Sequence, residues 1–574
     1  MGCRIEYERW LANSMMDEQN RHELEAIRGN TAEIEARFGS QLEFGTAGLR
    51  GVLGAGLSRM NVFTVRQATQ GLANLIREQG QEAARRGVAL ACDSRHMSNE
   101  FVQASAEVLA AAGIHAYVFD ELRPTPELSF AVRELHCIAG INITASHNPK
   151  QYNGYKAYWE DGAQLSPEQA DIVLREIRNN DIFEDVHFMP MEEAERKGFI
   201  TYLGRDFDEK YLARVMEQSV DGPKVEGAES FKIIYTPFHG AGYRLVPELL
   251  SRLGFSHIVP VPQQMVLDGD FPTVKSPNPE DKEGFLLAIG LAKKENSDLI
   301  IGTDPDSDRA GILVRDQKGD YVSLTGNQVG VLLADFIIRA RREKGTLPAN
   351  AAIISTIVST RMTREICRRN GVDYFEVLTG FKFIGERIKE FEATGSHTFL
   401  FGFEESYGYL AGTYARDKDA VVASMLIAEM AVWYRKRGMT LFDAVGALYE
   451  KYGFFAERTV SIKIEGSDAQ ERMRKLMLHL RAEAPREAAG RPVLAVRDYQ
   501  SGERVEFATG ARSATNLPKS NVLYYEFGDE NYVVVRPSGT EPKVKLYVLA
   551  HAAAQQDAAA LLDSLEQGFR ELLA

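Results

Sequence analysis

Cysteine is scarce in this sequence and follows no pattern. The four cysteines are scattered, with no C-x-x-C pair and no paired Cys/His spacing. Structural zinc sites and disulfide frameworks depend on such spacings, so neither is expected. Unpaired thiols are typical of a reducing compartment, and we therefore expect a cytoplasmic protein.

Long apolar runs and an excess of basic residues are also absent. The apolar stretch at residues 351–358 is too short to cross a bilayer and is rich in β-branched residues, as a buried strand is. The opening MGCRIEYERW contains no apolar core of a signal peptide. With 81 acidic and 67 basic residues, the formal charge of −14 disfavours nucleic acid and membranes as partners. An anionic ligand would need its own local cluster of Arg and Lys.

Three fingerprints of common enzyme classes are missing as well. There is no Walker A sequence and no dinucleotide-binding glycine pattern, so a kinase or a dehydrogenase has no support. There is no G-x-S-x-G elbow either, which leaves a Ser-His-Asp hydrolase without support.

For about three quarters of its length the sequence alternates short apolar runs with longer amphipathic stretches. The apolar runs predict strands at residues 88–94, 115–120, 138–145, 232–237, 298–304, 351–358 and 397–403. The amphipathic stretches predict helices at residues 100–112, 244–254 and 325–344. This alternation predicts layered α/β domains with mostly parallel sheets, and the length predicts three to five domains at roughly 100–200 residues each.

After about residue 450 the pattern changes. Residues 454–464, 531–538 and 543–550 alternate apolar with polar side chains, which is typical of half-buried antiparallel strands. Residues 554–573 predict a final helix that covers one face of the sheet. We therefore expect a smaller α+β domain at this end. Polar breaks at residues 204–208, 315–321 and 436–440 are the candidate domain boundaries.

The segment TASHNP, residues 144–149, ends the apolar run 138–145. Functional loops of layered α/β folds follow the carboxyl ends of strands. Asn148 and Pro149 favour a turn that takes Ser146 out of regular structure. By itself the pattern also fits an ordinary turn, so at this point Ser146 is a candidate nucleophile only.

The segment GTDPDSDR, residues 302–309, follows another apolar run. Its carboxylates Asp304, Asp306 and Asp308 repel one another unless a cation lies among them, and an all-oxygen ligand set favours Mg²⁺, Mn²⁺ or Ca²⁺ over zinc. An EF-hand is excluded because its sixth and twelfth positions are Arg309 and Arg315 instead of Gly and Glu. A solvated acidic turn is the remaining alternative.

Two further segments offer groups that suit a sugar phosphate. In RPSGTEPK, residues 536–543, a Ser-Gly-Thr turn presents backbone N–H groups, Arg536 can grip two phosphate oxygens and Lys543 adds a charge. In GFEESYG, residues 402–408, two carboxylates and a hydroxyl lie in a glycine-flanked loop. A glycine hairpin and a solvated loop are the plain alternatives. Single cations in turn-rich loops, at Arg50, Arg95 and Lys156, add to the set.

Taken together, these strings resemble the α-D-phosphohexomutase superfamily. FGTAGLRG, TASHNP, GTDPDSDR, GFEESYG and RPSGTEPK occur in the order of that family between residues 44 and 547. SHNPKQYNGYKAYW and FPTVKSPNPED are more similar to the phosphoglucomutase/phosphopentomutase branch than to the phosphomannomutase and phosphoglucosamine branches. Phe403 and Ser307 depart from residues common in the family, which leaves the sugar preference open.

The resemblance implies a heart-shaped arrangement of four domains, three related α/β domains with mixed sheets and a smaller α+β domain. We expect the phosphoserine loop in residues 1–207, the metal-binding loop in 208–320, the sugar-binding loop in 321–450 and the phosphate-binding loop in 451–574.

The resemblance also implies roles for the matching residues. Ser146 would be the phosphoserine, and its phosphate would share one Mg²⁺ with Asp304, Asp306 and Asp308. The sugar hydroxyls would contact Glu404 and Ser406. The expected ligands of the phosphate that is not transferred are Arg536, Ser538, Gly539, Thr540 and Lys543. The groups expected near the transferring phosphoryl group are Arg50, Lys156, Arg309 and Lys382.

The activity that this resemblance implies is the interconversion of glucose 1-phosphate and glucose 6-phosphate, with glucose 1,6-bisphosphate as intermediate and activator. The base that accepts the hydroxyl proton is Lys156 or His147, and the sequence does not choose between them. A phosphopentomutase, a phosphomannomutase and a bisphosphate synthase are alternatives of the same chemistry, and a phosphatase that uses the same serine and metal is a second alternative. A sugar-phosphate sensor or scaffold is the alternative without catalysis. We expect a monomer or a weak dimer.

Overall fold

The computed structural model describes residues 2–44, 48–466, 468–538 and 543–573. The chain divides into two units. The first comprises residues 1–324, 385–393 and 407–433, and the second comprises residues 325–384, 394–406 and 434–574. Helices α15 (Phe381–Thr394) and α16 (Ala420–Arg435) contribute residues to both units. Across the described residues, no helix combines the length and the apolarity needed to cross a bilayer.

A six-stranded sheet with the order β1-β5-β4-β2-β3-β6 organises the beginning of the first unit. Its strands are β1 (Leu49–Val52), β2 (Val88–Cys92), β3 (Ala116–Phe119), β4 (Ala139–Ile143), β5 (Tyr152–Trp159) and β6 (Ile200–Leu203). Strands β4, β2, β3 and β6 are parallel, whereas β5 runs antiparallel to β4 and β1 antiparallel to β5.

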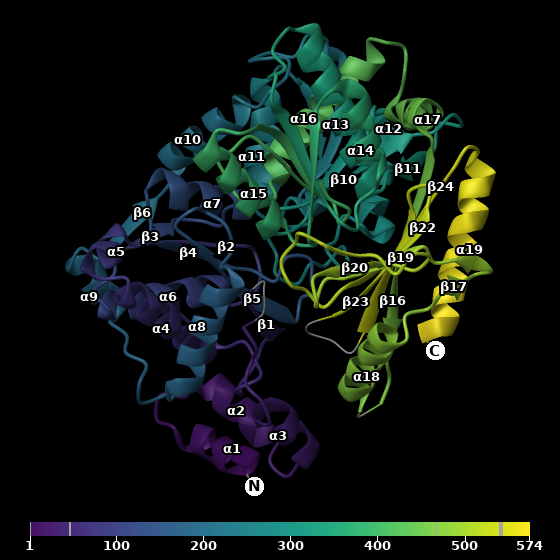
Figure 1. The fold of residues 1–574 in the computed structure, drawn as a ribbon. Helices are drawn as coiled ribbons and strands as arrows, with labels where there is room; N and C mark the ends of the chain where they lie inside the picture. Colours follow the sequence, from purple (N-terminus) through teal and green to yellow (C-terminus); the bar gives the residue numbers. More distant parts are fainter. Residues whose placement is uncertain (1, 45–47, 467, 539–542, 574) are drawn as a thin grey trace. The chain divides into compact units, whose positions relative to one another are not determined.

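Helices cover both faces of this sheet. They are α4 (Val62–Glu78), α5 (Gln81–Arg86), α6 (Ser98–Ala111), α7 (Thr125–Glu134), α8 (Pro167–Asn179) and α9 (Met191–Arg196). Helix α7 lies on one face, and α4, α6 and α8 lie on the other (Figure 1). Because it is covered on both sides, β4 is buried at every position. Ahead of the sheet, helices α1 (Gly2–Ala12), α2 (Glu18–Ala26) and α3 (Thr31–Phe38) pack around Trp10 and Phe38.

A second mixed sheet follows in the same unit, with the order β11-β10-β9-β7-β8. Its strands are β7 (Lys232–Thr236), β8 (His257–Pro260), β9 (Leu299–Thr303), β10 (Ala310–Arg315) and β11 (Tyr321–Ser323). Strands β8, β7 and β9 are parallel, whereas β10 and β11 are antiparallel to their neighbours. Its helices are α10 (Arg205–Met216), α11 (Gly242–Arg252) and α12 (Leu286–Glu295). The short strand β15 (Gly408–Ala411) also belongs to the first unit.

The second unit contains three parallel strands, β12 (Ala351–Thr356), β13 (Asp373–Val377) and β14 (Thr398–Glu404). Helices α13 (Gly326–Glu343), α14 (Met362–Asn370) and α17 (Leu441–Tyr452) belong to the same unit. Strand β12 is buried at every position, which agrees with the apolar run from which it was predicted.

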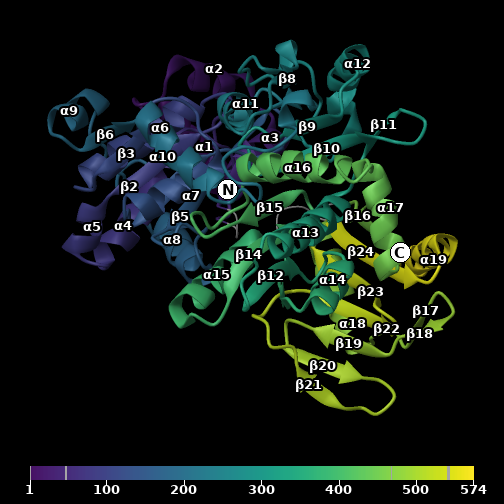
Figure 2. The ribbon, with the colours of Figure 1, turned by 90° about the horizontal axis from the view of Figure 1, so that it is seen from above.

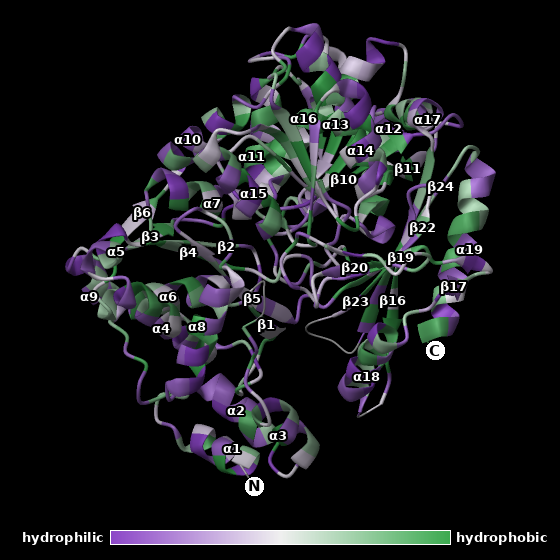
Figure 3. Cartoon of the chain, in the orientation of Figure 1, coloured by the Kyte–Doolittle hydropathy of each residue, from purple (hydrophilic) through white to green (hydrophobic). Residues whose placement is uncertain are grey.

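An antiparallel seven-stranded sheet completes the second unit, and its strands lie side by side in Figure 2. In spatial order they are β16 (Phe454–Lys463), β24 (Lys543–Ala552), β23 (Asn531–Pro537), β22 (Leu523–Gly528), β19 (Ala495–Asp498), β20 (Glu503–Glu506) and β21 (Arg512–Ala514). Strands β17 (Glu487–Ala488) and β18 (Arg491–Pro492) form a separate pair. Helices α18 (Ala469–Ala482) and α19 (Gln555–Leu573) bury apolar side chains against one face. Helix α19 carries both polar and apolar residues (Figure 3), and its buried side chains recur every three to four residues, as on the apolar face of an amphipathic helix.

The structure confirms the seven strands and three helices predicted from residues 88 to 403, and also the antiparallel strands and the final helix after residue 450. The mixed sheets that the resemblance implied are confirmed, because β5 and β10 return antiparallel to the strands that precede them, whereas the alternation pattern alone predicted mostly parallel sheets. One expectation needs correction. The polar break at residues 315–321 is the turn between the paired strands β10 and β11, so the second sheet continues past residue 320.

Candidate active site

Ser146 lies just beyond β4, in the turn that leads into β5. Its φ of 54° is in the left-handed region, which a non-glycine residue adopts only when its surroundings hold it there. The Ser146 backbone N–H donates to Thr144 Oγ1 at 2.8 Å, and Thr144 Oγ1 donates to Asp93 Oδ2 at 2.6 Å. The side chain of Ser146 is almost completely buried. The turn therefore fixes the serine hydroxyl in one place.

Arg95 stabilises the same turn through hydrogen bonds to its backbone. Its guanidinium donates to the backbone carbonyls of Ser146 (2.7 Å), Asn148, Pro149 (3.0 Å) and Tyr152 (2.9 Å). Because one buried cation satisfies four carbonyls, the turn can remain buried without losing its hydrogen bonds. The sequence identified Arg95 only as a cation in a turn-rich loop.

The loop between β9 and β10 carries the three aspartates. Asp304 Oδ1 accepts hydrogen bonds from the backbone N–H groups of Asp308 and Arg309, each at 3.0 Å, which closes the loop on itself. Asp304 Oδ2 accepts a hydrogen bond from Ser146 Oγ at 3.1 Å. The candidate nucleophile and the candidate metal loop, 158 residues apart in sequence, therefore meet side chain to side chain.

The three carboxylates form a group that can hold a metal ion. One oxygen from each of Asp304, Asp306 and Asp308 lies within 4.8 Å of the others, and all three side chains are buried. Oδ1 of Asp306 and Oδ1 of Asp308 are buried without a hydrogen-bond partner among the described residues. Burial and the charges of Asp306 and Asp308 raise the pKa of Asp304 well above its usual range. Buried oxygens without donors and mutual repulsion both fit a hard cation.

Two lysines lie against these carboxylates. Lys156 of β5 places its Nζ 2.7 Å from Asp306 Oδ2 and 3.2 Å from Asp308 Oδ2. Burial lowers the pKa of Lys156, but the two carboxylates outweigh burial and the pKa is raised above its usual value. Lys418 lies 3.2 Å from Asp308 Oδ2 and 2.8 Å from Asp417 Oδ1. Lys156 was predicted to be near this site, whereas Lys418 was missed.

Gly408 explains how Lys418 reaches the aspartates. A Cβ atom at residue 408 would lie 2.1 Å from the Cδ atom of Lys418, so only glycine leaves room for the lysine side chain. The sequence assigned this glycine to the shape of the sugar-binding loop. The one signal for Lys418 was the charged run at residues 416–419 directly before an apolar helix.

Three further predicted site residues of the first unit are His147, Arg50 and Arg309. His147 Nδ1 lies 3.1 Å from Ser146 Oγ. Burial, together with the charges of Arg309 and Arg50, lowers the pKa of His147 well below its usual value, so the ring is neutral. Arg50 donates to Asn148 Oδ1 at 2.9 Å, and Arg309 donates to Glu280 Oε1 at 3.2 Å.

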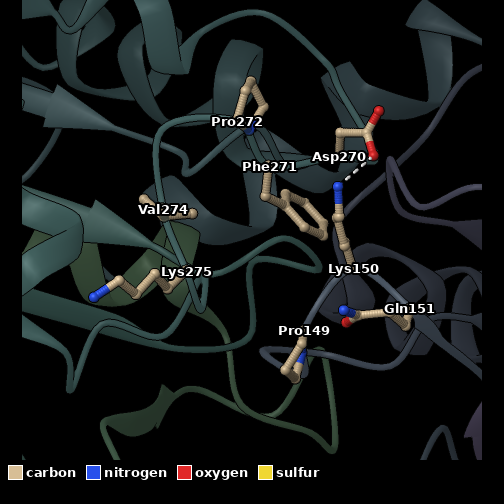
Figure 4. Close-up of a pocket in the computed structure, with 8 residues that line it drawn as sticks. All are labelled: Pro149, Lys150, Gln151, Asp270, Phe271, Pro272, Val274 and Lys275. Carbon is tan, nitrogen blue, oxygen red and sulfur yellow. Dashed lines mark hydrogen bonds and ion pairs between the residues drawn. The ribbon is translucent and has the colours of Figure 1, made fainter.

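A segment between β8 and α12 supports the serine turn from outside. Lys150 of the turn forms an ion pair with Asp270 at 3.0 Å, and both line a pocket of about 320 Å³ (Figure 4). The ring of Phe271 lies 5.1 Å from the guanidinium of Arg95, and Ser276 Oγ donates to the carbonyl of His147 at 3.1 Å. The sequence used this segment only as a mark of resemblance.

In the second unit the predicted sugar-binding residues lie at and beyond the end of β14. Glu404 is buried, and its Oε1 accepts a hydrogen bond from the backbone N–H of Gly380 at 2.8 Å. Ser406 is half-buried in the following turn, and Lys382 is buried in the same unit.

The described members of the predicted phosphate-binding set lie at the end of β23 and the start of β24. Arg536 and Ser538 are half-buried, and the Ser538 N–H donates to the Lys543 carbonyl at 2.8 Å. Gly539 and Thr540 lie outside the described residues. Tyr547 of β24 lies within electrostatic reach of both sets of residues. Burial raises its pKa, Glu405 raises it further, and Arg536 opposes both.

Comparisons with known proteins agree with this arrangement. Four family models match in order, described as phosphoglucomutase/phosphomannomutase α/β/α domains I, II and III and the C-terminal domain. The matched residues are 41–183, 209–319, 325–452 and 478–564. A curated phosphoglucomutase of Staphylococcus aureus is 38% identical over 519 residues, which are 90% of this chain and 91% of that protein.

Solved structures share the fold. A phosphoglucomutase/phosphomannomutase family protein from Burkholderia thailandensis aligns with a TM-score of 0.67 and 21% identity, over 93% of this chain and 97% of that chain. Parafusin, a phosphoglucomutase from Paramecium, aligns with a TM-score of 0.65 and 17% identity, over 93% of this chain and 95% of that chain.

Proposed function

The chain belongs to the phosphoglucomutase/phosphomannomutase family of the α-D-phosphohexomutase superfamily, and we propose that it interconverts glucose 1-phosphate and glucose 6-phosphate. In this proposal Ser146 carries the phosphoryl group between the two sugar positions, and glucose 1,6-bisphosphate is the intermediate. The observation that supports it most is the contact at 3.1 Å between Ser146 Oγ and Asp304 Oδ2, because it joins a buried hydroxyl to a three-carboxylate group. Glucose is the preferred sugar because the S. aureus relative is a phosphoglucomutase.

The same group of carboxylates is proposed to hold one Mg²⁺. Asp304, Asp306 and Asp308 supply only oxygen ligands, which Mg²⁺ prefers, and the phosphate on Ser146 would add a further oxygen. When bound, the ion offsets the negative charge that spreads over the phosphoryl oxygens during transfer.

Residues of this chain account for the rest of the charge stabilisation. Phosphoryl transfer passes through a loose transition state, so positioning and charge do most of the catalysis. Lys156 forms an ion pair with Asp306, and the positive charges of Arg309 and Arg50 are close enough to His147 of the serine turn to lower its pKa. We assign these three cations to the phosphoryl group during transfer.

Proton transfer is assigned to His147 and not to Lys156. His147 Nδ1 lies 3.1 Å from Ser146 Oγ, so it can receive the hydroxyl proton when Ser146 takes the phosphoryl group back from the bisphosphate. Lys156 Nζ is engaged by two carboxylates instead. In the opposite direction the sugar hydroxyl attacks the phosphorus on Ser146, and the bond from phosphorus to Ser146 Oγ breaks. The neutral His147 ring would take the proton of the sugar hydroxyl and pass it to the departing serine oxygen, so the ring ends neutral as it began.

The second unit is proposed to recognise the sugar phosphate. Glu404 and Ser406 would bind sugar hydroxyls, and Lys382 would approach the transferring group. The phosphate that is not being transferred would bind Arg536, Ser538, Gly539, Thr540 and Lys543. The bisphosphate must turn over between the two half-reactions, so these residues would bind either of its ends.

We also propose the four domains near the boundaries expected from the sequence. They lie near 1–207, 208–320, 321–450 and 451–574, except that the second domain ends after β11, at residue 324, because β11 pairs with β10. Sugar phosphates are the proposed partners, and a cytoplasmic monomer or weak dimer is the proposed state.

A coupled assay tests the function directly. Purified protein is mixed with Mg²⁺, glucose 1-phosphate and a trace of glucose 1,6-bisphosphate, and glucose 6-phosphate is followed. We expect fast turnover that requires the metal and is stimulated by the bisphosphate. Conversion of ribose 1-phosphate or mannose 1-phosphate with a higher kcat/KM would reassign the sugar, and release of free phosphate would indicate a phosphatase. Binding of sugar phosphates without any turnover would favour a sensor.

A further inference from the structure

The six oxygens of the three aspartates are not used alike. Asp304 Oδ1 accepts two backbone N–H groups, Asp306 Oδ2 accepts Thr125 and Lys156, and Asp308 Oδ2 faces two lysines. The remaining oxygens accept few hydrogen bonds from the described residues: Oδ2 of Asp304 accepts one, from the Ser146 hydroxyl, and Oδ1 of Asp306 and of Asp308 accept none. Asp308 Oδ1 also lies 3.8 Å from Arg309 Nε. Hydrogen bonds and ion pairs with the protein therefore fix the orientation of each carboxylate. On Asp306 one of these partners is a neutral side chain, that of Thr125.

Thr125 grips Asp306 at two points. Its backbone N–H donates to the carbonyl of Asp306 at 2.8 Å, and its Oγ1 donates to Asp306 Oδ2 at 2.8 Å. Thr125 is the first residue of α7, is completely buried, and stands between Pro124 and Pro126, which limit the backbone at the start of the helix. The two hydrogen bonds to Asp306 thus come from the start of α7, 181 residues away in sequence.

Asn142 fixes the direction of the Thr125 hydroxyl. Asn142 of β4 donates from Nδ2 to Thr125 Oγ1 at 2.6 Å. Because the hydroxyl oxygen accepts this proton, its own hydrogen is left for Asp306. Asn142 is completely buried and lies on the strand that ends just before the Ser146 turn, so β4 orients a metal-loop carboxylate as well as the serine.

We propose that Thr125 is a positioning residue for the cation site, with Asn142 as its support. By holding Asp306 through Oδ2, Thr125 turns Oδ1 toward the position where the cation binds. A hydrogen-bonded neighbour that orients a ligand carboxylate typically changes metal affinity 10–100-fold when it is lost. This inference rests on the metal role of the three aspartates in the proposed function, and not on the identity of the sugar.

The test measures binding of Mn²⁺ alone, by electron paramagnetic resonance of the free ion, with no sugar present. We expect Thr125→Val, which keeps the shape but lacks the hydroxyl, to weaken Mn²⁺ binding about 10–100-fold. Thr125→Ser keeps the hydroxyl and should stay within about 3-fold of the original protein. Thr69→Val removes another completely buried hydroxyl, on α4, and should leave Mn²⁺ affinity unchanged. Asp306→Asn marks the loss of a direct ligand.

The outcomes separate the inference from the function on which it rests. If the original protein takes up no Mn²⁺, the cation site itself fails and the inference fails with it. If the original protein binds Mn²⁺ and Thr125→Val binds it equally well, the positioning role is overturned while the cation site stands. Should Thr125→Val fail to fold, Asn142→Ala becomes the deciding variant, since it leaves Thr125 in place but frees its hydroxyl. Its Mn²⁺ affinity should fall about 3–10-fold, and an unchanged affinity would overturn the proposal.

Discussion

Ser146 and the aspartates of the first unit are almost completely buried, whereas Arg536, Ser538 and Lys543 of the second unit are half-buried at the end of β23 and the start of β24. The first group is held by side chains from many elements, including Arg95, Thr125 and Lys418. The groups proposed to react are therefore oriented before any ligand arrives, and the three groups proposed to bind the phosphate that is not transferred keep surface for contact. Preorganised charge favours a transition state, while recognition residues must release one end of the bisphosphate and accept the other.

The largest expected effect breaks the first unit's chemistry. Ser146→Ala removes the proposed phosphoryl carrier, and kcat in the coupled assay should fall about 10⁴-fold or more, as it does when other catalytic nucleophiles are lost. The affinity for glucose 1-phosphate, measured by calorimetry, should change only a few-fold. Turnover near that of the original protein would exclude Ser146 as the carrier.

The next effect concerns the contacts of Arg361 between α14 and the seven-stranded sheet of the second unit. Buried Arg361 donates to Glu530 at 3.0 Å and to Tyr524 Oη at 2.6 Å, and its guanidinium lies 5.0 Å from the Tyr532 ring. These bonds connect α14's amino-terminal end to the seven-stranded sheet. Arg361→Met leaves the buried Tyr524 hydroxyl without this partner and removes the ion pair of the partly exposed Glu530, and should lower the free energy of unfolding by about 2 kcal/mol.

Urea unfolding gives this change, and a neighbouring arginine provides the control. Arg364 also faces Glu530, at 3.5 Å, but is exposed, so Arg364→Met should cost about 0.5 kcal/mol or less. Mn²⁺ binding by the first unit should be the same in both variants. Equal losses of stability for Arg361→Met and Arg364→Met would refute the assignment of the contact to Arg361.

A smaller effect is expected from Arg536→Lys, which should weaken phosphate binding without changing the reacting groups of the first unit. Lysine keeps the charge but loses the planar fork that binds two phosphate oxygens, and about 1.5 to 2 kcal/mol of binding should be lost. We expect kcat/KM for glucose 1-phosphate to fall about 10–30-fold, mainly through KM, with Mn²⁺ affinity unchanged. A fall in Mn²⁺ affinity as large as that of Thr125→Val would show that the two sets of residues do not act separately.

How far the sequence predicts this site depends on how local each part is. The serine turn, the aspartate loop and the strands before them were predicted because each lies in one contiguous run of residues. Arg95, Thr125 and Lys418 were not assigned their roles, because a single polar residue in a loop looks like surface until the topology brings it to a partner. Thr125 lies at the start of α7, which packs on the first sheet, and Asp306 lies in the loop after β9 of the second sheet. The two residues become neighbours only in the folded chain.

The mixed sheets show a second physical limit. Alternation of strand and helix patterns predicts parallel βαβ units, yet both functional loops join antiparallel strands, leading into β5 after Ser146 and into β10 after the aspartates. Such a short connection keeps the loop tight, and β5 brings Lys156 back beside the aspartates. The alternation pattern alone missed the antiparallel strands at these two loops, whereas the family resemblance correctly implied mixed sheets.

The smallest expected effect depends on pH and lies in the second unit. Glu457 of β16 accepts a hydrogen bond from Thr360, and burial, the larger influence, raises its pKa to about 7. An acid whose pKa is raised by folding makes the folded state less favourable as pH rises from its unfolded pKa, 4.5, to its folded pKa. The full shift corresponds to about 3 kcal/mol, and partial exposure of the side chain reduces this to about 1 to 2 kcal/mol.

Glu457→Gln removes the titration and keeps the shape. In urea unfolding the variant should match the original protein near pH 4.5 and exceed its stability by about 1 to 2 kcal/mol at pH 8, with the gain developing between these values. Glu450→Gln, at an exposed glutamate of α17, should show no such gain. A gain of equal size at both pH values would mean that the charge of Glu457 is not its cause. A gain confined to high pH would establish that the second unit, like the first, keeps a carboxylate at a cost to stability, but at a contact within its fold instead of at a site for a cation.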